Sequence, residues 1–462
     1  MRTLIVDIIK NEGKEVELYG WVHARRDHGK LVFIDLRDRS GIAQIVFGPQ
    51  VSSASDLRLE YVVKIIGQVK KRPPNMVNDK IITGEYEIDA ISLEILNKTG
   101  EMPMPVDNDG RGINEETRLK YRYLDLRRER MKNNLIARHK IIKYMRDFLS
   151  DNDFIEIETP NLSKSTPEGA RDYLVPSRLQ KGNFYALPQS PQQYKQLLMV
   201  GGLEKYFQFA RCFRDEDTRG DRQPEFTQFD LEMSFVEQED VMALNEKLLI
   251  DLIKALYPQK KIQEIPFPRM TYKDAMEKYG IDRPDIRNDK NDPDLLAFCW
   301  IIDFPFFEKD DNGGWTFTHN PFSKPKPEFM EDLLAQKNIE NILTTQYDIT
   351  MNGLEIGGGS IRNHQSEALK SVFRIMGYKD EETIAKFGHM LTALDSGAPP
   401  HGGIAWGIDR LVSLLQNEPN IREVIAFPKT GDGRDLMMDA PSAVDKKQLE
   451  ELGIEIKKID KK

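Results

Sequence analysis

Cysteine is scarce in this chain of 462 residues, because Cys212 and Cys299 are its only two and lie far apart. No Cys-x-x-Cys pair occurs, which excludes a disulfide framework and a zinc site built on paired cysteines. Long apolar runs are also missing, since none approaches the ~18 residues of a membrane-spanning helix. Acidic residues follow soon after the first methionine, unlike in a secretion signal. We therefore expect a protein of the reducing cytoplasm.

Basic residues are outnumbered, with 66 Lys and Arg against 75 Asp and Glu, so the net charge is −9. A negative total argues against nucleic-acid binding, which depends on Lys and Arg. The charge is nevertheless uneven: residues 111–146 contain 12 basic and 4 acidic side chains, whereas residues 1–100 contain 15 and 14. The basic segment predicts that part of the surface attracts phosphate groups.

Short alternating segments fill the first hundred residues, and Gly and Pro separate them. Residues 16–22, 31–36, 42–47 and 61–69 show the patterns of short strands. About five short strands without a long helical pattern favour a small β-barrel such as an OB-fold. We assign this N-terminal domain to residues 1–104.

A second pattern begins after residues 102–112, which contain Pro and Gly and indicate a linker. Apolar residues recur at helical spacing from 135 to 149, and a strand pattern follows at 154–159. Strands and helices then alternate irregularly, and neither GxGxxG nor GxxxxGK[ST] occurs. This combination favours an antiparallel α+β domain over a Rossmann or P-loop fold.

The strongest chemical signal is a pair of strand segments, 206–214 and 226–235, joined by a charged loop. Side chains two residues apart share one face of a strand, so Arg214 lies on the face of Gln208 and Ala210. The matching face of the second segment comprises Phe226, Gln228, Asp230 and Glu232. A solvated hairpin is the alternative. The aromatic residue within a polar face favours a surface that binds an anionic, ring-containing ligand.

Ser190 and Pro191 indicate the start of a helix, with Ser at the N-cap and Pro at the first helical position. Gln192 and Lys195 then share a helical face. An ordinary capped helix with an exposed lysine is the alternative.

Two carboxylates, Asp348 and Glu355, precede the triglycine 357–359. Carboxylates together with phosphate oxygens are the usual ligands of Mg²⁺, and a simple glycine turn is the alternative. Further along, Arg410 falls in the first turn of a predicted helix. A cation there opposes the helix dipole unless an anion is present, which favours an anionic ligand.

Together these segments resemble the class II aminoacyl-tRNA synthetases, and among them the aspartyl-tRNA synthetases of bacterial type. Residues 213–216 with 222–228 are similar to the second motif of that class, and residues 407–410 to the third. Residues 154–160 are similar to the first motif, which forms much of a dimer interface in this class. Residues 165–178 resemble a signature of the aspartyl family.

The resemblance implies that the chain joins L-aspartate to tRNA-Asp through an aspartyl-adenylate, as a homodimer, with ATP as substrate and Mg²⁺ as cofactor. Because a carboxylate is already ionised at neutral pH, activation needs positioning and charge stabilisation rather than a general base. Arg214 and Arg410 would be catalytic, and Asp348 and Glu355 would bind Mg²⁺. The implied ATP site comprises Arg214, Asp215, Glu216, Gln223, Phe226, Glu355, Gly407, Ile408, Asp409 and Arg410.

The aspartate site implied by the resemblance comprises Glu168, Gln192, Lys195, Arg214, Asp230, His319 and Arg362. In it, Arg362 and Lys195 pair with the side-chain carboxylate, since a guanidinium fork prefers that planar anion to an amide. His319 is followed by Asn320, where bacterial relatives usually carry a second histidine.

The N-terminal barrel would bind the anticodon, because OB-folds stack bases on aromatic side chains within a basic groove. The residues implied for this contact are Arg25, Arg26, His28, Phe33 and Gln44. The identity of His28 favours use of tRNA-Asn as well as tRNA-Asp. A core phenylalanine with surface arginines is the alternative for these positions.

The implied domains are residues 1–104 for the OB-fold, 105–133 for a hinge and 134–462 for the catalytic domain. Bacterial aspartyl enzymes normally carry an inserted domain between the second and third motifs, which is missing here near 285–294, and we expect activity to be retained. Within the class, an asparagine- or lysine-specific enzyme is the rival, and Arg362 with Lys195 favours a dicarboxylic substrate over both. A non-catalytic RNA-binding relative is the rival from another class.

Overall fold

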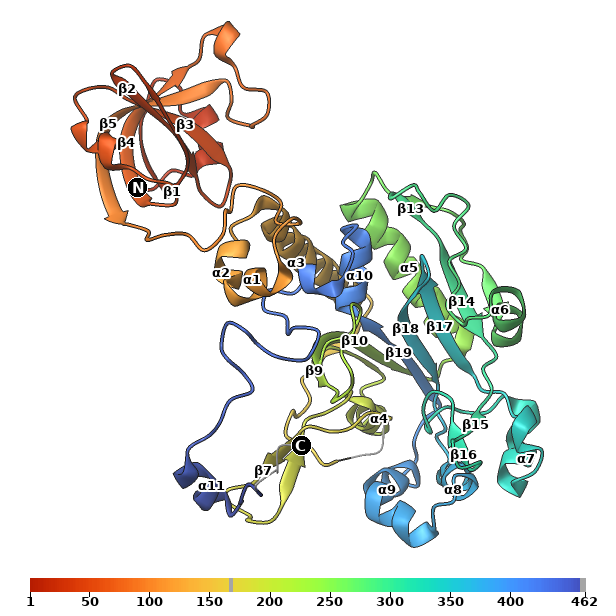
Figure 1. The fold of residues 1–462 in the computed structure, drawn as a ribbon. Coiled ribbons are helices and arrows are strands. Elements are labelled where there is room, and N and C mark those ends of the chain that lie inside the picture. Colours follow the sequence, from red (N-terminus) through yellow and green to blue (C-terminus); the bar gives the residue numbers. More distant parts are fainter. Residues whose placement is uncertain (166–168, 458–462) are drawn as a thin grey trace. The chain divides into compact units, whose positions relative to one another are not determined.

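The computed structural model describes residues 1–165 and 169–457. The chain forms two compact units, Met1–Asp109 and Gly110–Lys462 (Figure 1). The whole basic segment 111–146 therefore belongs to the second unit. None of the helices in the described ranges combines the length and the apolar character of a membrane-spanning segment.

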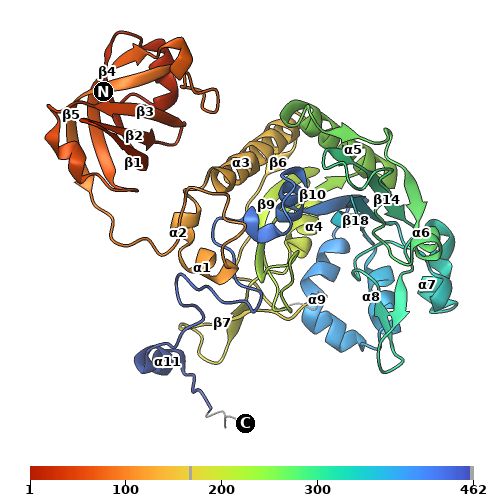
Figure 2. The ribbon, with the colours of Figure 1, turned by 45° about the horizontal axis from the view of Figure 1, so that its top comes forward.

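The first unit is a closed barrel in which the strands follow the order β1-β2-β3-β5-β4 (Figure 2). Alternate side chains point inward, so Val16, Leu18 and Val22 are buried in its core, where they are removed from water. The predicted small barrel is confirmed. Its strands are β1 (Glu15–His28), β2 (Leu31–Arg37), β3 (Ile42–Phe47), β4 (Val62–Lys71) and β5 (Tyr86–Asn97).

The second unit is built on an eight-stranded sheet in the order β12-β14-β17-β18-β19-β10-β9-β6. Its strands are β6 (Ile155–Glu156), β9 (Lys205–Phe213), β10 (Glu225–Ser234), β12 (Arg269–Thr271), β14 (Phe298–Ile302), β17 (Gln346–Met351), β18 (Leu354–Ile361) and β19 (His401–Gly407). Neighbours are antiparallel except at the two edges, where β12 pairs with β14 and β6 with β9 in parallel. The predicted antiparallel α+β architecture is confirmed.

The strand predicted at 154–159 is shorter in the structure, since only Ile155 and Glu156 form β6. Pro160 follows and lacks the N–H that a longer strand would need. Three short strand pairs lie outside the large sheet. They are β7 (Leu174–Pro176) with β8 (Phe184–Ala186), β11 (Lys261–Ile262) with β13 (Leu295–Leu296), and β15 (Phe307–Lys309) with β16 (Trp315–Phe317).

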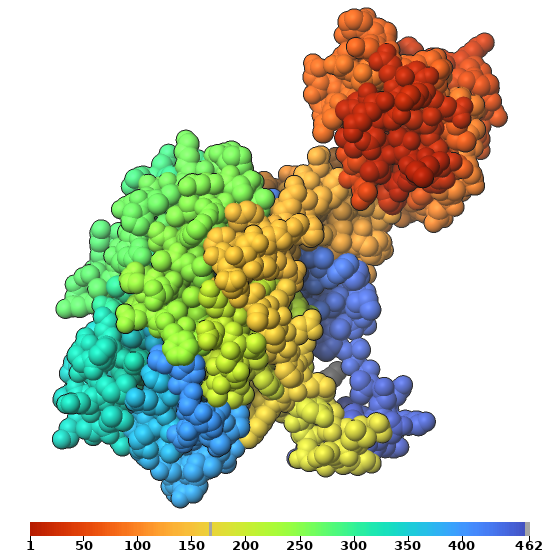
Figure 3. Space-filling view, turned by 180° about the vertical axis from the view of Figure 1, so that it is seen from behind, coloured from red at the N-terminus to blue at the C-terminus, as the bar shows by residue number. Residues whose placement is uncertain are grey.

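Helices cover both faces of the large sheet. The main hydrophobic core lies between one face and α3 (Glu129–Ser150), α5 (Gln238–Leu256) and α10 (Ile408–Leu415), and α3 and α5 lie side by side on the surface of this unit (Figure 3). On the other face, α4 (Gln192–Val200) packs against β9 and β10. The remaining helices are α1 (Glu115–Lys120), α2 (Arg122–Asp125), α6 (Tyr272–Tyr279), α7 (Met330–Ala335), α8 (Ser366–Ile375), α9 (Asp380–Leu394) and α11 (Lys446–Leu452).

Several charges of the basic segment 111–146 face inward, whereas others, such as Lys120, Lys140 and Lys143, are exposed. For the exposed ones, the attraction of phosphate stays a prediction. Arg118, Arg122 and Arg128 are 5%, 2% and 1% exposed. All three donate to Asp125, at 3.0, 2.7 and 2.7 Å. The reason is that a buried guanidinium requires a carboxylate partner, so these arginines stabilise the second unit from inside.

Candidate active site

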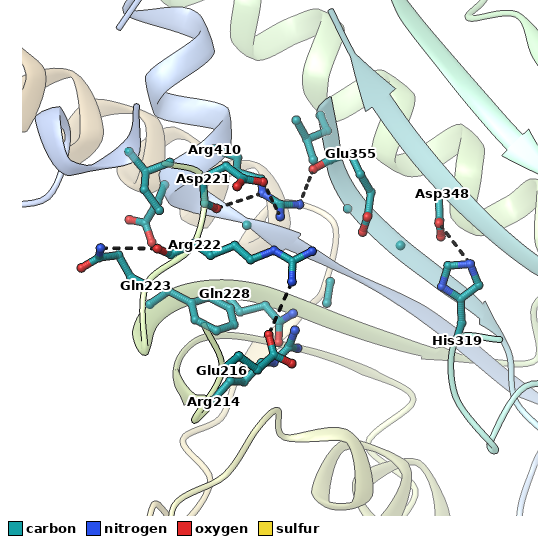
Figure 4. Close-up of a pocket in the computed structure, with 18 of the residues that line it drawn as sticks. Arg214, Glu216, Asp221, Arg222, Gln223, Gln228, His319, Asp348, Glu355 and Arg410 are labelled. Atoms are coloured by element: carbon teal, nitrogen blue, oxygen red, sulfur yellow. Dashed lines mark hydrogen bonds and ion pairs between the residues drawn. The ribbon is translucent and has the colours of Figure 1, made fainter. Parts of the chain in front are cut away.

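Two adjoining cavities of about 360 and 150 Å³ lie on the polar face of the large sheet. Arg214, Gln228 and His319 line both, so the cavities form one cleft with a larger and a smaller compartment. Figure 4 shows side chains that line the larger compartment. The predicted residues that line the larger compartment are Arg214, Glu216, Gln223, Phe226, His319, Asp348, Glu355, Gly407, Asp409 and Arg410. Those that line the smaller one are Gln192, Lys195, Arg214, Asp230, His319 and Arg362.

The pairing of strands explains why distant residues meet here. Gln228 of β10 pairs with Ala210 of β9 on one side and with Gly407 of β19 on the other. Asp230 lines the smaller compartment, whereas Phe229 between them is buried in the core. The alternation predicted for these strands is therefore confirmed.

Arg214 is a cation without an ion pair among the described residues. Its backbone N–H donates to the carbonyl of Pro224 at 2.8 Å, which fixes the residue beside β10. The carbon Cζ of its guanidinium lies 5.1 Å from the centre of the Phe226 ring, a cation–π distance. The two side chains thus present a charge and an aromatic surface to the same compartment.

Arg410 projects into the larger compartment from the first turn of α10, as predicted (Figure 4). Its Nη1 donates to the carbonyl of Glu355 at 2.8 Å, and its Nη2 donates to Oδ2 of Asp221 at 3.2 Å. The carboxylate of Asp221 offsets the unfavourable position of a cation at a helix N-terminus. Asp221 was missed in the sequence, where it is one of several acids in the loop 215–224.

Asp348 and Glu355 come from the adjacent strands β17 and β18 and line the same compartment. Burial raises the pKa of Asp348 to about 7, and the nearby Glu355 adds to the rise. Gln346 donates to Asp348 at 2.7 Å. Gly358 pairs with Asp348, and a Cβ at this glycine would lie 2.5 Å from the Asp348 oxygen Oδ1. The triglycine thus makes room for the carboxylate.

A cation at this carboxylate pair would find two protein ligands rather than a closed set. In the described part of the chain, no group of three or more His, Cys, Asp or Glu side chains is placed to hold a metal ion. Oδ2 of Asp348 also lies 3.6 Å from Nε2 of His319. Further oxygen ligands would have to come from a bound molecule.

The smaller compartment contains two buried cations and two buried carboxylates. Nζ of Lys195 lies 3.0 Å from Oδ2 of Asp230 and 3.3 Å from Oε2 of Glu232. Arg362 donates through Nε and Nη2 to both Glu232 oxygens, at 2.8 and 3.1 Å, and through Nη1 to Ser360 at 2.9 Å. A guanidinium has five N–H groups, so two remain on Nη1 and Nη2 for a ligand.

Neighbouring charges tune the two carboxylates differently. Burial raises the pKa of Asp230 to about 6. Burial also opposes the charge of Glu232, but Arg362 and Lys195 hold its pKa below the usual range. Glu232 is therefore the fixed anion of the compartment. The strand alternation placed it on the polar face, but its role in holding Arg362 is visible only in the structure.

Two residues predicted for the ATP site do not line the cleft. Ile408 is 0% exposed and belongs to the hydrophobic core, because it starts α10 on the side that faces the sheet. Asp215 pairs through its backbone with Arg171. Glu168, predicted for the aspartate site, lies outside the described residues.

Two further predicted residues line the cleft but bind protein. Gln223 joins the loop around Lys429, since its Nε2 donates to the Lys429 carbonyl at 3.2 Å and its Oε1 accepts from the Lys429 N–H at 2.7 Å. Asp409 forms an ion pair with Arg138 of α3. Both therefore hold the walls of the larger compartment together.

On the barrel, Arg26, Phe33 and Gln44 share the outer face, whereas Arg25 does not. Arg26 pairs with Phe33 across β1 and β2, and its Nη2 lies 3.4 Å from the Gln44 oxygen. Arg25 pairs with the core residue Ile34 and donates to the Ser55 carbonyl at 2.9 Å. Neighbouring strand residues face opposite ways, so the structure does not bring Arg25 together with the other three.

His28 ends β1 and is exposed. Two residues missed in the sequence extend the outer-face set. Arg72 donates to the Gln44 oxygen at 3.1 Å, and the Gln44 nitrogen donates to Glu87 at 2.8 Å. These contacts join β3 to β4 and β5, so no local pattern could have indicated them.

Comparison with known families agrees with this geometry. The family model described as tRNA synthetases class II (D, K and N) matches residues 114–431, and the OB-fold nucleic acid binding domain matches residues 16–96. The first match covers more than half of the chain. The chain belongs to the class II tRNA synthetases of the D, K and N group.

Within that group it is similar to enzymes named aspartate-tRNA(Asp/Asn) ligase. The relative from Caldanaerobacter subterraneus subsp. tengcongensis is 42% identical, and the one from Dehalococcoides mccartyi strain CBDB1 is 41% identical. Each match covers 97% of this chain and 97% of the relative. The first alignment has 577 positions against 462 residues here, a difference of 115, so that relative has at least 115 residues without a counterpart.

Solved structures share the fold. Asparaginyl-tRNA synthetase from Pyrococcus horikoshii, complexed with asparaginyl-adenylate, has a TM-score of 0.75 at 22% identity, over 93% of this chain and 98% of that one. A putative aspartyl-tRNA synthetase from Leishmania major Friedlin has a TM-score of 0.75 at 18% identity, over 93% and 94%.

Proposed function

We propose that the protein activates L-aspartate with ATP and transfers it to tRNA-Asp, and that it also charges tRNA-Asn. The observation that carries this proposal is the smaller compartment, where Lys195 and Arg362 are buried next to a larger compartment lined by Arg214 and Arg410. An amino acid with an acidic side chain and a nucleotide would lie there with their reacting groups side by side.

In the first step, the aspartate α-carboxylate attacks the α-phosphorus of ATP, forming aspartyl-adenylate and releasing pyrophosphate. In the second, a hydroxyl of the terminal adenosine of tRNA attacks the activated carbonyl and releases AMP. The first step needs no proton removal, because the carboxylate is ionised at neutral pH. Catalysis then consists of alignment and of stabilising charge on the phosphates.

The residues of the larger compartment divide this work. Arg214 contacts the α-phosphate and the substrate carboxylate, and Phe226 stacks on the adenine. Arg410 binds the γ-phosphate, for which it gives up its contact with Asp221. The Asp221 side chain is 34% exposed, so water can solvate its carboxylate once the contact is lost.

The carboxylates of Asp348 and Glu355 fit a Mg²⁺ ion. Burial raises the pKa of Asp348, which means that its ionised form lacks a cationic partner strong enough to hold it. Two carboxylates leave most of an octahedral shell to phosphate oxygens and water, as Mg²⁺ prefers. When bound, the ion would neutralise phosphate charge.

Aspartate is selected by the two N–H groups that remain on Arg362 and by Lys195. Asparagine would place an amide N–H₂ against these donors, and a donor facing a donor is left unsatisfied at a cost of about 1–3 kcal/mol. His319 lines both compartments and contacts the bound substrate. Asp230 and Gln192 receive the ammonium, to which Glu168 also contributes.

The barrel binds the anticodon with Arg26, Phe33 and Gln44, and His28 lies at the edge of this surface. Use of tRNA-Asn is supported by His28 and by the names of the relatives. Charging of purified tRNA-Asp and tRNA-Asn side by side tests it. A rate with tRNA-Asn at background level would limit the protein to tRNA-Asp.

The working form is a cytoplasmic homodimer that pairs through the region of residues 154–160. Ile155 lies on β6 at the edge of the sheet and is 45% exposed, and Leu162 is 54% exposed. Such apolar side chains at a sheet edge favour a partner. Light scattering at micromolar concentration should give twice the chain mass of 53.3 kDa.

Amino-acid-dependent exchange of pyrophosphate into ATP tests the activation step. We expect exchange with aspartate and background exchange with asparagine and lysine. No exchange with aspartate, or faster exchange with asparagine, contradicts the proposed function. The inserted domain that is missing near residues 285–294 does not change this expectation, because both compartments are formed by residues outside that stretch.

A further inference from the structure

A chain of hydrogen-bonded side chains leads from His401 through Gln196 to Gln192, at the smaller compartment. His401, at the start of β19, and Gln196, on α4, are 0% and 1% exposed. Nδ1 of His401 lies 2.7 Å from the Pro399 carbonyl, and Nε2 lies 3.1 Å from the Gln196 nitrogen. The Gln196 oxygen in turn accepts from the Gln192 nitrogen at 3.1 Å. Gln192 lines the compartment.

The direction of every hydrogen bond in this chain follows from two facts, the carbonyl partner of His401 and the neutral state of its ring. A carbonyl only accepts, so Nδ1 of His401 carries a hydrogen and donates to Pro399. Burial lowers the pKa of His401, so the ring is neutral and its Nε2 accepts. Gln196 must therefore turn its nitrogen to His401 and its oxygen to Gln192. A flipped Gln196 would place two acceptors against each other.

The orientation of the Gln192 amide is then determined by its hydrogen bond with Gln196. Its nitrogen is engaged by Gln196, so its oxygen is the atom left to face a ligand. In the same compartment, Oδ1 of Asp230 is buried and has no hydrogen-bond partner among the described residues. The Gln192 oxygen and Oδ1 of Asp230 are thus available as acceptors, while the nearby cations Lys195 and Arg362 are already paired with carboxylates. A cationic group of the ligand fits these two acceptors.

We propose that His401 and Gln196 are positioning residues that turn the Gln192 oxygen toward the α-ammonium of the amino-acid substrate. This inference rests on the proposed function, because it assumes that the smaller compartment binds aspartate. Neither residue touches the substrate. Their effect reaches it only through the orientation of one amide.

Gln196→Met tests the proposal, because it keeps the length of the side chain and removes both hydrogen bonds. We expect the KM for aspartate in pyrophosphate exchange to rise about 10-fold or more, since a hydrogen bond to a charged group contributes about 1.5–3 kcal/mol. The inhibition constant of succinate, which lacks the ammonium, should stay within about twofold, as should the KM for ATP. An equal loss for aspartate and succinate, or no loss, overturns the proposal.

The matched control is Gln193→Met, on the next residue of α4. Gln193 is 8% exposed and also contacts a histidine, since its oxygen lies 2.6 Å from Nε2 of His389. It lines neither compartment of the cleft. We expect wild-type constants for this variant, and a matching rise in its aspartate KM would mean that any disturbance of α4 has the effect.

A double-mutant cycle with Gln192→Met adds a readout that a merely structural role would not move. If Gln196 acts through Gln192, Gln196→Met should not raise the aspartate KM further when Gln192 is already replaced. Additive effects overturn the proposal. Should Gln196→Met fail to fold, His401→Phe keeps the ring and removes the acceptor, and the same cycle applies. Absence of exchange in the wild-type protein would instead contradict the proposed function itself.

Discussion

The two compartments of the cleft hold their cations in opposite ways. In the smaller one, the side chains of Lys195 and Arg362 are 1% and 3% exposed and are tied to buried carboxylates. In the larger one, the side chains of Arg410 and Arg222 are 21% and 42% exposed and pair with carboxylates of a surface loop. One set is enclosed by the sheet, and the other borders solvent.

The difference matches what we propose that each compartment recognises, the aspartate side chain in the smaller one and ATP in the larger one. Donors whose positions cannot adjust distinguish a carboxylate from an amide. The buried carboxylates that pair with Lys195 and Arg362 would fix these donors in place. A polyphosphate carries several charges and changes during the reaction. The cations of the larger compartment would therefore exchange loop carboxylates for the phosphates of the proposed ATP at little cost, because exposed ion pairs contribute little.

Of the substitutions that test this comparison, Arg362→Ala should have the largest effect on activity with aspartate and on stability. It leaves Glu232 buried with Lys195 as its remaining cation. Breaking a buried pair lowers the free energy of unfolding by about 3–5 kcal/mol. The two hydrogen bonds that Arg362 would make to the substrate carboxylate contribute about 1.5–3 kcal/mol each, so we expect kcat/KM for aspartate to fall about 10²–10³-fold. The KM for ATP should change less than about twofold. Pyrophosphate exchange at varied aspartate and ATP measures both, and equal losses for the two substrates contradict the assigned role.

Arg410→Ala should lower kcat for exchange about 10²-fold, as expected for loss of a charge that stabilises the transition state. Unlike Arg362→Ala, it should leave the melting temperature near that of the wild type, since its partner Asp221 borders solvent. Arg211→Ala is the control, because Arg211 is an exposed cation on β9 that pairs with Glu225 outside the cleft. A large drop in melting temperature for Arg410→Ala would break the contrast between the compartments.

Acid should reduce the difference in stability between wild type and Arg362→Ala. The pKa of Glu232 is held below its usual 4.5 by Arg362 and Lys195. A carboxylate with a lowered pKa contributes stability that is complete above its usual pKa and is lost as the pH falls through the lowered value. The gap in unfolding free energy should therefore narrow as the pH falls below 4.5, as urea unfolding at several pH values would show.

Asp221→Asn should have the smallest effect and the opposite sign. It releases Arg410 before ATP arrives, so we expect the KM for ATP to fall between about 1.5-fold and fivefold, the range of an exposed ion pair. Asp217→Asn removes a carboxylate from the same compartment that has no ion pair in the described structure. An equal fall in both variants would show that the net charge of the loop, rather than the Arg410 contact, is responsible.

Strand periodicity predicted the floor of the cleft well. Gln228 and Asp230 share a face because side chains alternate along one strand. The position of Arg410 in the first turn of a helix follows from the signals that start that helix. These are local properties. Alternation alone does not show which of the neighbours Arg25 and Arg26 faces outward, because a register shift in β1 after Val22 changes the order of the faces.

The contacts that tune the site could not be predicted in this way. Glu232 and Arg362 are separated by 130 positions, and Gln196 and His401 by 205. Nothing in the neighbourhood of either residue indicates its partner. The inward-facing arginines near Asp125 are a similar case, since their charge is plain in the sequence and their burial is not.

The sequence by itself determined the two domain types, the strand faces and the kind of chemistry, because these follow from periodicity and residue type within short segments. The tertiary structure decided which charged side chains pair with each other inside the protein and which remain available to ligands. It did so because a side chain loses water, and gains or lacks a partner, only when strands such as β10, β18 and β19 are brought together.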